Sequence, residues 1–130
     1  MTFLDIKTIL ALTALTLFAA AFAMSLVMGQ ELSRAARAAR ASLFAQAGGW
    51  SCILASEFVW EMPLSVLAIV CASASSHLMF TALEHWLGKR PGKLLLRALC
   101  LLMPIGYALS FQNYPLRVGW SNMLLASQFV

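Results

Sequence analysis

The chain has 130 residues, of which 62% are hydrophobic and 11% are charged, and its mean hydropathy is +0.83. A soluble domain is about half apolar and about a quarter charged, so this composition excludes an ordinary water-soluble protein and predicts a membrane protein. The net charge of +4 does not indicate nucleic-acid binding, because the cations lie in short clusters between apolar runs and not along an amphipathic face.

The first apolar run covers residues 6–28 and is long enough to cross a bilayer, which takes about 20 mostly apolar residues. Inside it, the stretch "AFAMS" at 21–25 is similar to the cleavage site of a signal peptide. Arg34, Arg37 and Arg40 follow, and clustered arginines directly after an apolar segment resist export. We therefore predict an uncleaved membrane anchor.

Two further spans are predicted at residues 43–60 and 62–87, joined by the turn "WEMP" at 60–63. Proline favours the first turn of a helix, so Pro63 is expected near the start of the third span. Small residues spaced by four positions let helices approach closely in a membrane. The second and third spans each carry such a row, and we expect contact along them: Ala47, Ser51 and Ala55, and Ala68, Ala72 and Ser76.

The fourth predicted span covers residues 94–112 and is closed by the turn "QNYP" at 112–115. Another apolar run, at 118–130, contains about 13 residues and is too short to cross. We therefore expect an all-α, polytopic membrane bundle with four complete transmembrane helices and the start of a fifth, cut from a longer chain. The lipid bilayer is its predicted partner, and nucleic acid is not.

Lysines and arginines predict the orientation of the spans, because clusters of them stay on the cytoplasmic side. The segment between the second and third spans has only Glu57 and Glu61, and Lys7 and Arg117 are the two cations that do not fit the pattern. We predict a multi-pass protein of the bacterial inner membrane with its amino terminus outside. The cytoplasmic determinants are Arg34, Arg37, Arg40, Lys89, Arg90, Lys93 and Arg97.

The first candidate site is His77, which lies about midway along the third span, where ionisable groups are rare and often functional. Thr81, Glu84 and His85 continue a polar stripe from it at helical spacing. A haem or metal site needs a second ligand at the same depth, and the sequence has no second mid-membrane histidine. Two interpretations stay open: a residue that senses a ligand or protons, and a neutral histidine hydrogen-bonded to a neighbouring helix.

Glu57 and Glu61 form the second candidate site, since residues four apart share a face if the helix continues, and two carboxylates can bind a cation. A helix break near Pro63 instead leaves them as solvated interfacial groups. The three cysteines have no spacing typical of zinc or redox sites. We predict no metal, no cofactor and no catalytic residue, because no nucleotide-binding loop, nucleophile elbow or zinc-protease motif occurs.

Several short stretches in order resemble the amino-terminal membrane region of bacterial GGDEF-type diguanylate cyclases. They are "FLDIKTILALTAL", "GGW", "ALEHWLGKRP" and "NYPLRVGWSNMLLAS", and the matching residues include Leu4, Asp5, Ile6, Lys7, Trp86, Leu87, Gly88, Lys89, Arg90 and Pro91. The chain departs from that family at the short "WEMP" turn and at Ser73–Ser76, where an asparagine is common.

This resemblance implies an input or anchor module for signal transduction. It implies a homodimer formed through the parent protein, and cyclic di-GMP synthesis by a cytoplasmic domain beyond Val130, since the GGDEF signature is absent from the chain. Two alternatives stay open. A small proton-coupled transporter would need a carboxylate deep in a span, and a subunit of a haem or redox complex would use His77 as an axial ligand.

Overall fold

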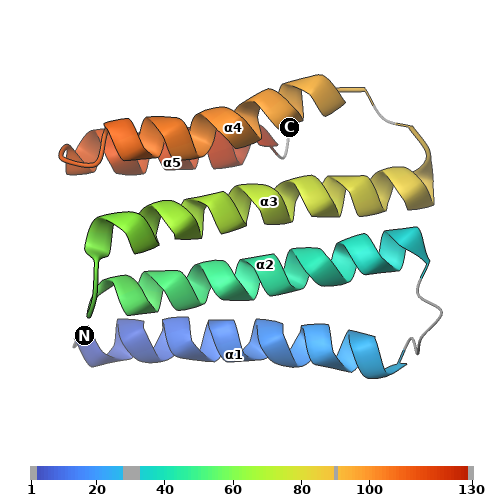
Figure 1. Cartoon of the computed structure of the whole chain (residues 1–130), viewed down its shortest axis with the longest axis horizontal. Helices are drawn as coiled ribbons and strands as arrows, with labels where there is room; N and C mark the ends of the chain where they lie inside the picture. The colour runs from blue at the N-terminus through green and yellow to red at the C-terminus, as the bar shows by residue number, and fades with distance from the viewer. Residues whose placement is uncertain (1–2, 28–32, 90, 129–130) are drawn as a thin grey trace.

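The structure is a computed structural model that describes residues 3–27, 33–89 and 91–128 (Figure 1). Within these ranges the chain is helical and contains no strand, which confirms the predicted all-α class. The helices in chain order are α1 (Phe3–Val27), α2 (Arg34–Ser56), α3 (Glu61–Leu87), α4 (Lys93–Leu109) and α5 (Tyr114–Gln128).

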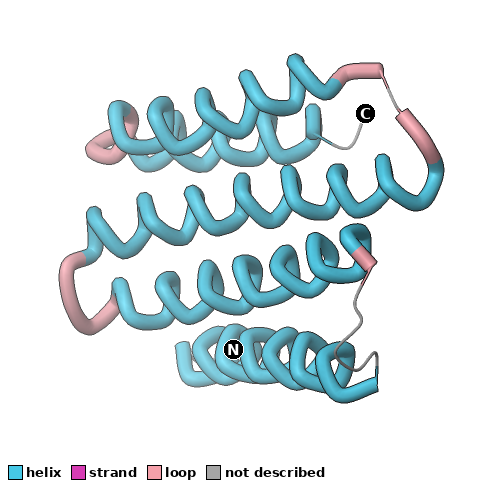
Figure 2. Tube along the Cα trace, turned by 45° about the vertical axis from the view of Figure 1, so that its right-hand side comes forward, coloured by secondary structure: helices cyan, strands magenta, loops and turns pink. Residues whose placement is uncertain are grey.

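The five helices run antiparallel to their sequence neighbours, and the extensive contacts all join consecutive helices (Figures 1 and 2). The largest interface joins α2 to α3, and α5 lies against α4. One end of the array, called the turn end below, holds the start of α1 and the α2–α3 and α4–α5 turns (Figure 1). The other end, called the basic end, holds the start of α2, the end of α3 and the start of α4.

The boundaries of α3 agree with the predicted third span of residues 62–87 to within one residue. Pro63 lies in its first turn, as predicted, where its missing N–H has no intrahelical partner to lose. The chain reaches this helix through Trp60, whose backbone is left-handed with φ 46°. The α2 helix therefore stops at Ser56 and does not run on into α3.

The second span is predicted to start at residue 43, whereas the helix that contains it, α2, begins nine residues earlier. Ser33 caps this start, and its side-chain oxygen accepts a hydrogen bond from the backbone N–H of Ala36 at 3.2 Å. The segment that follows, "RAARAARAS", is built from alanine and arginine, which favour the helix strongly. The three arginines predicted in a connecting segment therefore lie on a helix.

The boundaries between the last two helices also differ from the prediction. α4 ends at Leu109 and not at residue 112. At this end the hydroxyl of Ser110 donates to the carbonyl of Gly106 at 2.7 Å. α5 begins four residues before the apolar run at 118. Asn113, a residue type that favours positions just before a helix, accepts the backbone N–H of Arg117 at 2.9 Å through its carbonyl.

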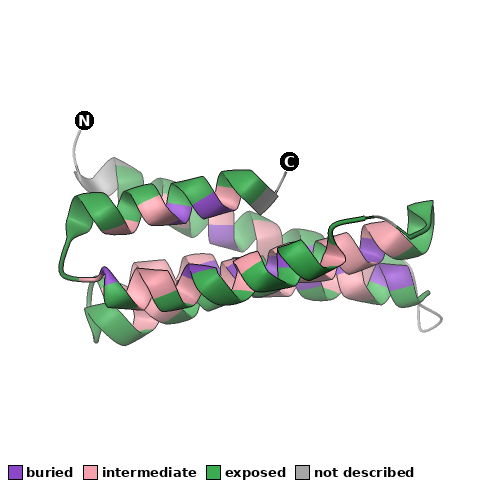
Figure 3. Ribbon diagram, turned by 90° about the horizontal axis from the view of Figure 1, so that it is seen from above, coloured by how far each residue is buried: buried purple, intermediate pink, exposed green. Residues whose placement is uncertain are grey.

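The buried residues lie along the faces where the helices meet (Figure 3). Most of them are small, and many large apolar side chains are exposed. Eight of the eleven buried apolar residues in the described part of the chain are alanines. Leu26, Leu94 and Leu109 are 83%, 82% and 84% exposed. A water-soluble protein buries its large aliphatic side chains, and exposed apolar surface of this extent is typical of a face that meets lipid or protein.

Two helices in the described residues are long and apolar enough to cross a membrane: Ile6–Val27 in α1 and Glu61–Leu87, the whole of α3. By length and composition, two of the described helices and not four qualify as complete spans. Helix α2 carries three arginines in its 23 residues, and α4 and α5 have 17 and 15 residues.

Candidate functional site

The structure places His77 on α3, partly buried and away from the other candidate residues. Its backbone carbonyl accepts the hydroxyl of Thr81 at 2.9 Å, which is a contact within the helix. In the described residues no group of three or more histidine, cysteine or acidic side chains is placed to hold a metal ion. The described residues form no hydrogen bond with the imidazole of His77. The structure therefore supports neither of its two interpretations.

The two glutamates of the second candidate site are not brought together on one helix face. Glu57 caps the end of α2, whereas Glu61 is the exposed first residue of α3, beyond the left-handed Trp60. The cation partner of Glu57 comes from α1, because Lys7 Nζ lies 2.6 Å from Glu57 Oε2. The Lys7 ammonium also lies 5.2 Å from the ring centroid of Phe58.

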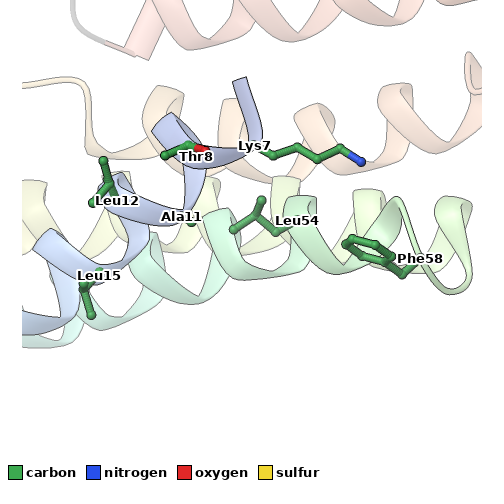
Figure 4. Close-up of a pocket in the computed structure, with 7 residues that line it drawn as sticks. All are labelled: Lys7, Thr8, Ala11, Leu12, Leu15, Leu54 and Phe58. Atoms are coloured by element: carbon green, nitrogen blue, oxygen red, sulfur yellow. The ribbon is translucent and has the colours of Figure 1, made fainter. Parts of the chain in front are cut away.

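This ion pair stands at the rim of an open groove of about 510 Å³ between α1 and α2 (Figure 4). Leu12 and Leu15 come from α1, Leu54 comes from α2, and the Lys7 side chain reaches toward Phe58. The walls are mostly aliphatic and aromatic, and the polar groups among the lining residues are the Lys7 ammonium and the Thr8 hydroxyl. Its lining residues are Lys7, Thr8, Ala11, Leu12, Leu15, Leu54 and Phe58.

We expect Lys7→Glu and Glu57→Lys to lower stability singly and to restore much of it together. The side chains are 42% and 37% exposed, so the coupling free energy should be modest, about 0.5–1 kcal/mol. A double-mutant cycle measured by unfolding in mixed detergent micelles checks this. Purely additive single effects would show that the pair does not hold α1 to α2.

The basic end gathers most of the predicted topology determinants. Arg34 and Arg37 are exposed there, while Arg40 donates to Ser25 Oγ at 3.4 Å and Lys93 Nζ lies 2.5 Å from Glu84 Oε2. Lys89 and Arg97 are the other described cations of this end, and Arg90 lies outside the described residues.

The two ends therefore differ in charge. Among the residues whose side chains the structure describes, six cations and one carboxylate, that of Glu84, lie at the basic end, and two cations and two carboxylates lie at the turn end. The first turns of α2 and α4 contain cations and no acid. The positive amino ends of these two helices are opposed by the negative carboxyl ends of α1 and α3 at the same end of the array, so the charge difference comes from the side chains.

Polar contacts that no sequence pattern predicted join the middle helices. The hydroxyl of Ser42 on α2 donates to the carbonyl of Ser75 on α3 at 2.9 Å. Between α3 and α4, the hydroxyl of Ser73 lies 3.4 Å from the sulfur of Met103, and the Cys100 thiol donates to the Ser73 carbonyl at 3.4 Å. All three cysteines are free, so these groups serve helix packing.

The structure also explains the position of Arg117, the second cation that did not fit the charge pattern. Its guanidinium carbon lies 4.6 Å from the ring centroid of Phe111, 5.5 Å from that of Tyr107 and 5.4 Å from that of Tyr114. These four residues, called the Arg117 cluster below, come from the end of α4, the turn and the start of α5. Their spacing of four, three and three positions was a helix-like pattern in the sequence, but the chain reverses within it.

No protein-family model, no curated protein and no solved structure matches this chain. The resemblance to GGDEF-type diguanylate cyclases therefore stays a prediction from short sequence stretches.

Proposed function

We propose that this chain is the multi-pass, membrane-embedded module of a bacterial signalling protein, with the basic end in the cytoplasm and the amino terminus outside. The observation that carries the proposal is the distribution of side chains by size, with alanine, serine and glycine between the helices and leucine, isoleucine and phenylalanine on the outside. Close approach through small residues is how helices associate in lipid, where apolar side chains gain nothing by leaving the surface.

The charge difference between the ends supports the orientation, because clusters of lysine and arginine remain on the inner side of the membrane. In this orientation α2 crosses with its arginines at the inner surface, where long side chains extend to the headgroups. Helix α4, with 17 residues, is at the lower limit of about 17 residues for a span. Four spans and the start of a fifth follow in this proposal.

The finer proposal is that the module anchors, or provides the input for, a diguanylate cyclase. It is supported by the short stretches that resemble this family and by the direction of α5, which runs from the turn end toward the basic end (Figure 1). A domain following α5 would enter the cytoplasm, where GTP is available for cyclic di-GMP synthesis. The gene sequence beyond Val130 tests this part, since the absence of a GGDEF domain would contradict it.

Reporter fusions test the topology. Alkaline phosphatase, which is active only outside the cytoplasm, should be active after Met62 and Tyr114, and a fluorescent protein should fluoresce after Gly29 and Pro91. Carbonate extraction of the untagged chain provides the control for membrane insertion. The reversed reporter pattern would contradict the orientation, and release of the chain by carbonate would contradict the membrane proposal itself.

No observation favours the two alternative functions, a proton-coupled transporter and a subunit of a haem or redox complex. The described carboxylates Glu57, Glu61 and Glu84 lie in the last or first turns of helices or next to them, and not at mid-depth. The described part of the chain brings no second histidine or cysteine ligand together with His77 in a metal-binding group.

A further inference from the structure

We propose that the Arg117 cluster binds the phosphate of a phospholipid headgroup, in the membrane leaflet at the turn end. This inference rests on the proposed membrane embedding and adds a ligand class and a binding residue to it.

Arg117 has attractive contacts with aromatic rings, but its guanidinium has no hydrogen-bond acceptor among the described side chains. Rings of Tyr107, Phe111 and Tyr114 surround its guanidinium within 5.5 Å, and such rings attract a cation through their faces. A guanidinium also carries five N–H donors in its plane. Among the residues whose side chains are described, none accepts a hydrogen bond from these donors, so an external acceptor fits this site.

The described carboxylates of the turn end do not pair with Arg117. Glu57 is engaged by Lys7 at 2.6 Å, and Glu61 is exposed at the start of α3 and forms no ion pair in the described structure. Arg117 lies in the first turn of α5, where the positive end of the helix adds to its field. Neither of these carboxylates forms an ion pair with Arg117 in the described structure, so Arg117 can bind an external anion, and a phosphate matches the planar fork of arginine.

The surroundings of the cluster favour a lipid phosphate over a soluble anion. Leu109 and Leu116 flank the cluster at the end of α4 and the start of α5, and both are largely exposed. Tyrosines gather at the level of the lipid headgroups. A headgroup bound by Arg117 would therefore place its acyl chains along exposed leucines. Because one cation is enclosed by rings, we expect a single, saturable site, unlike the many exposed cations of the basic end.

The tyrosines provide a selective probe, since both tyrosines of the chain belong to this cluster. The full chain labelled with 3-fluorotyrosine should show two ¹⁹F resonances in micelles of an uncharged detergent. We propose to titrate it with dihexanoyl phosphatidylglycerol, with dihexanoylglycerol, which lacks the phosphate, and with inorganic phosphate. The variants are Arg117→Gln, Arg117→Lys and the control Arg97→Gln, which removes an exposed arginine at the basic end.

The phospholipid should shift both resonances in a saturable way, and dihexanoylglycerol and inorganic phosphate should not at equal concentration. Arg117→Gln should weaken binding at least about tenfold, because a charge-assisted hydrogen-bonded pair is lost. Arg117→Lys should bind with intermediate affinity, since lysine keeps the charge without the fork, and Arg97→Gln should bind like the wild type. If Arg117→Gln does not fold and its two resonances are not resolved, the affinity of Arg117→Lys is compared with that of the wild type instead.

An equal response to dihexanoylglycerol would overturn phosphate recognition, and an equal response to inorganic phosphate would overturn the assignment to a lipid. Unchanged affinity in both Arg117 variants would overturn the role of Arg117. A chain that resists carbonate extraction but shows no titration contradicts this inference alone. A chain that carbonate releases contradicts the membrane proposal.

Discussion

Gly106→Ala is expected to separate α5 from α4 and to lower the free energy of unfolding by about 1–3 kcal/mol, the usual cost of overpacking. A Cβ atom at Gly106 would overlap Nε1 and Cε2 of the Trp120 indole and would lie 2.7 Å from its Cζ2. An indole is rigid and cannot fold away as the end of a long side chain does. The two helices must therefore move apart, and α5 has no other extensive contact within the described chain.

The matched control is Gly119→Ala, on the helix that carries Trp120, because nothing lies within 4 Å of a Cβ at Gly119. Alanine favours the helix over glycine by about 1 kcal/mol, so this variant should be as stable as the wild type or slightly more stable. Unfolding by increasing the fraction of dodecyl sulfate in mixed micelles, followed by circular dichroism, compares the two. Equal midpoints for both variants would show that the Gly106–Trp120 contact does not hold the hairpin together.

Gly49→Leu should have a comparable or larger effect, at the upper end of about 3 kcal/mol for overpacking, because it acts at the largest interface. A Cβ at Gly49 would lie 3.2 Å from the backbone oxygen of Ala68 and 3.2 Å from Cys71 Cβ. Backbone atoms of α3 cannot rotate away, and leucine adds three more carbon atoms beyond the Cβ. We expect the α2–α3 pair to open and the hydrogen bond between Ser42 and Ser75 to be lost.

Gly48→Leu provides the comparison for this variant. It places the same side chain one residue earlier on α2, where nothing lies within 4 Å of a Cβ. The same micelle titration should leave Gly48→Leu close to the wild type. If Gly48→Leu destabilised the protein as much as Gly49→Leu, the effect would come from loss of glycine at this part of α2 and not from the contact with α3.

The helices with a strong local pattern were the ones that the sequence predicted well. The long apolar run of α3, with a proline in its first turn, gave both ends to within one residue. The start of α2 was missed because hydropathy marks where apolar residues begin, whereas Ser33 and the alanine–arginine segment determine where the helix begins. The start of α5 was missed for the same reason, since Asn113 initiates it before the apolar run.

The predicted rows of small residues were right in type and only partly right in register. Ala47 and Ala68 are buried, but Ala55 is exposed. Successive residues at a spacing of four turn by about 40° around a helix of 3.6 residues per turn, so such a row drifts off the interface. The residues that do meet α3, such as Gly49 and Ser42, can be identified only when the facing helix is known.

The candidate site depended even more on contacts between distant segments. The sequence identified Glu57 as a candidate with no cation near it in the chain. The cation that pairs with Glu57 is Lys7, which lies fifty residues earlier. Likewise, Arg117 was an exception to the charge pattern until the α4–α5 turn placed three aromatic rings around it. In both cases a short-range pattern identified an unusual residue, and only the fold identified its partner.

The neighbour-to-neighbour order of the helices has a consequence for how the protein is made. Each helix docks onto the one synthesised just before it, so assembly involves closing only short connections, and such local topologies fold fast. Domains and segments emerge from the ribosome in order during synthesis, and here each helix after α1 emerges when its preceding partner has already been made. Within the described chain α5 has extensive contacts with α4 alone, so we expect α5 to be the first of these helices to detach when the folded protein is stressed.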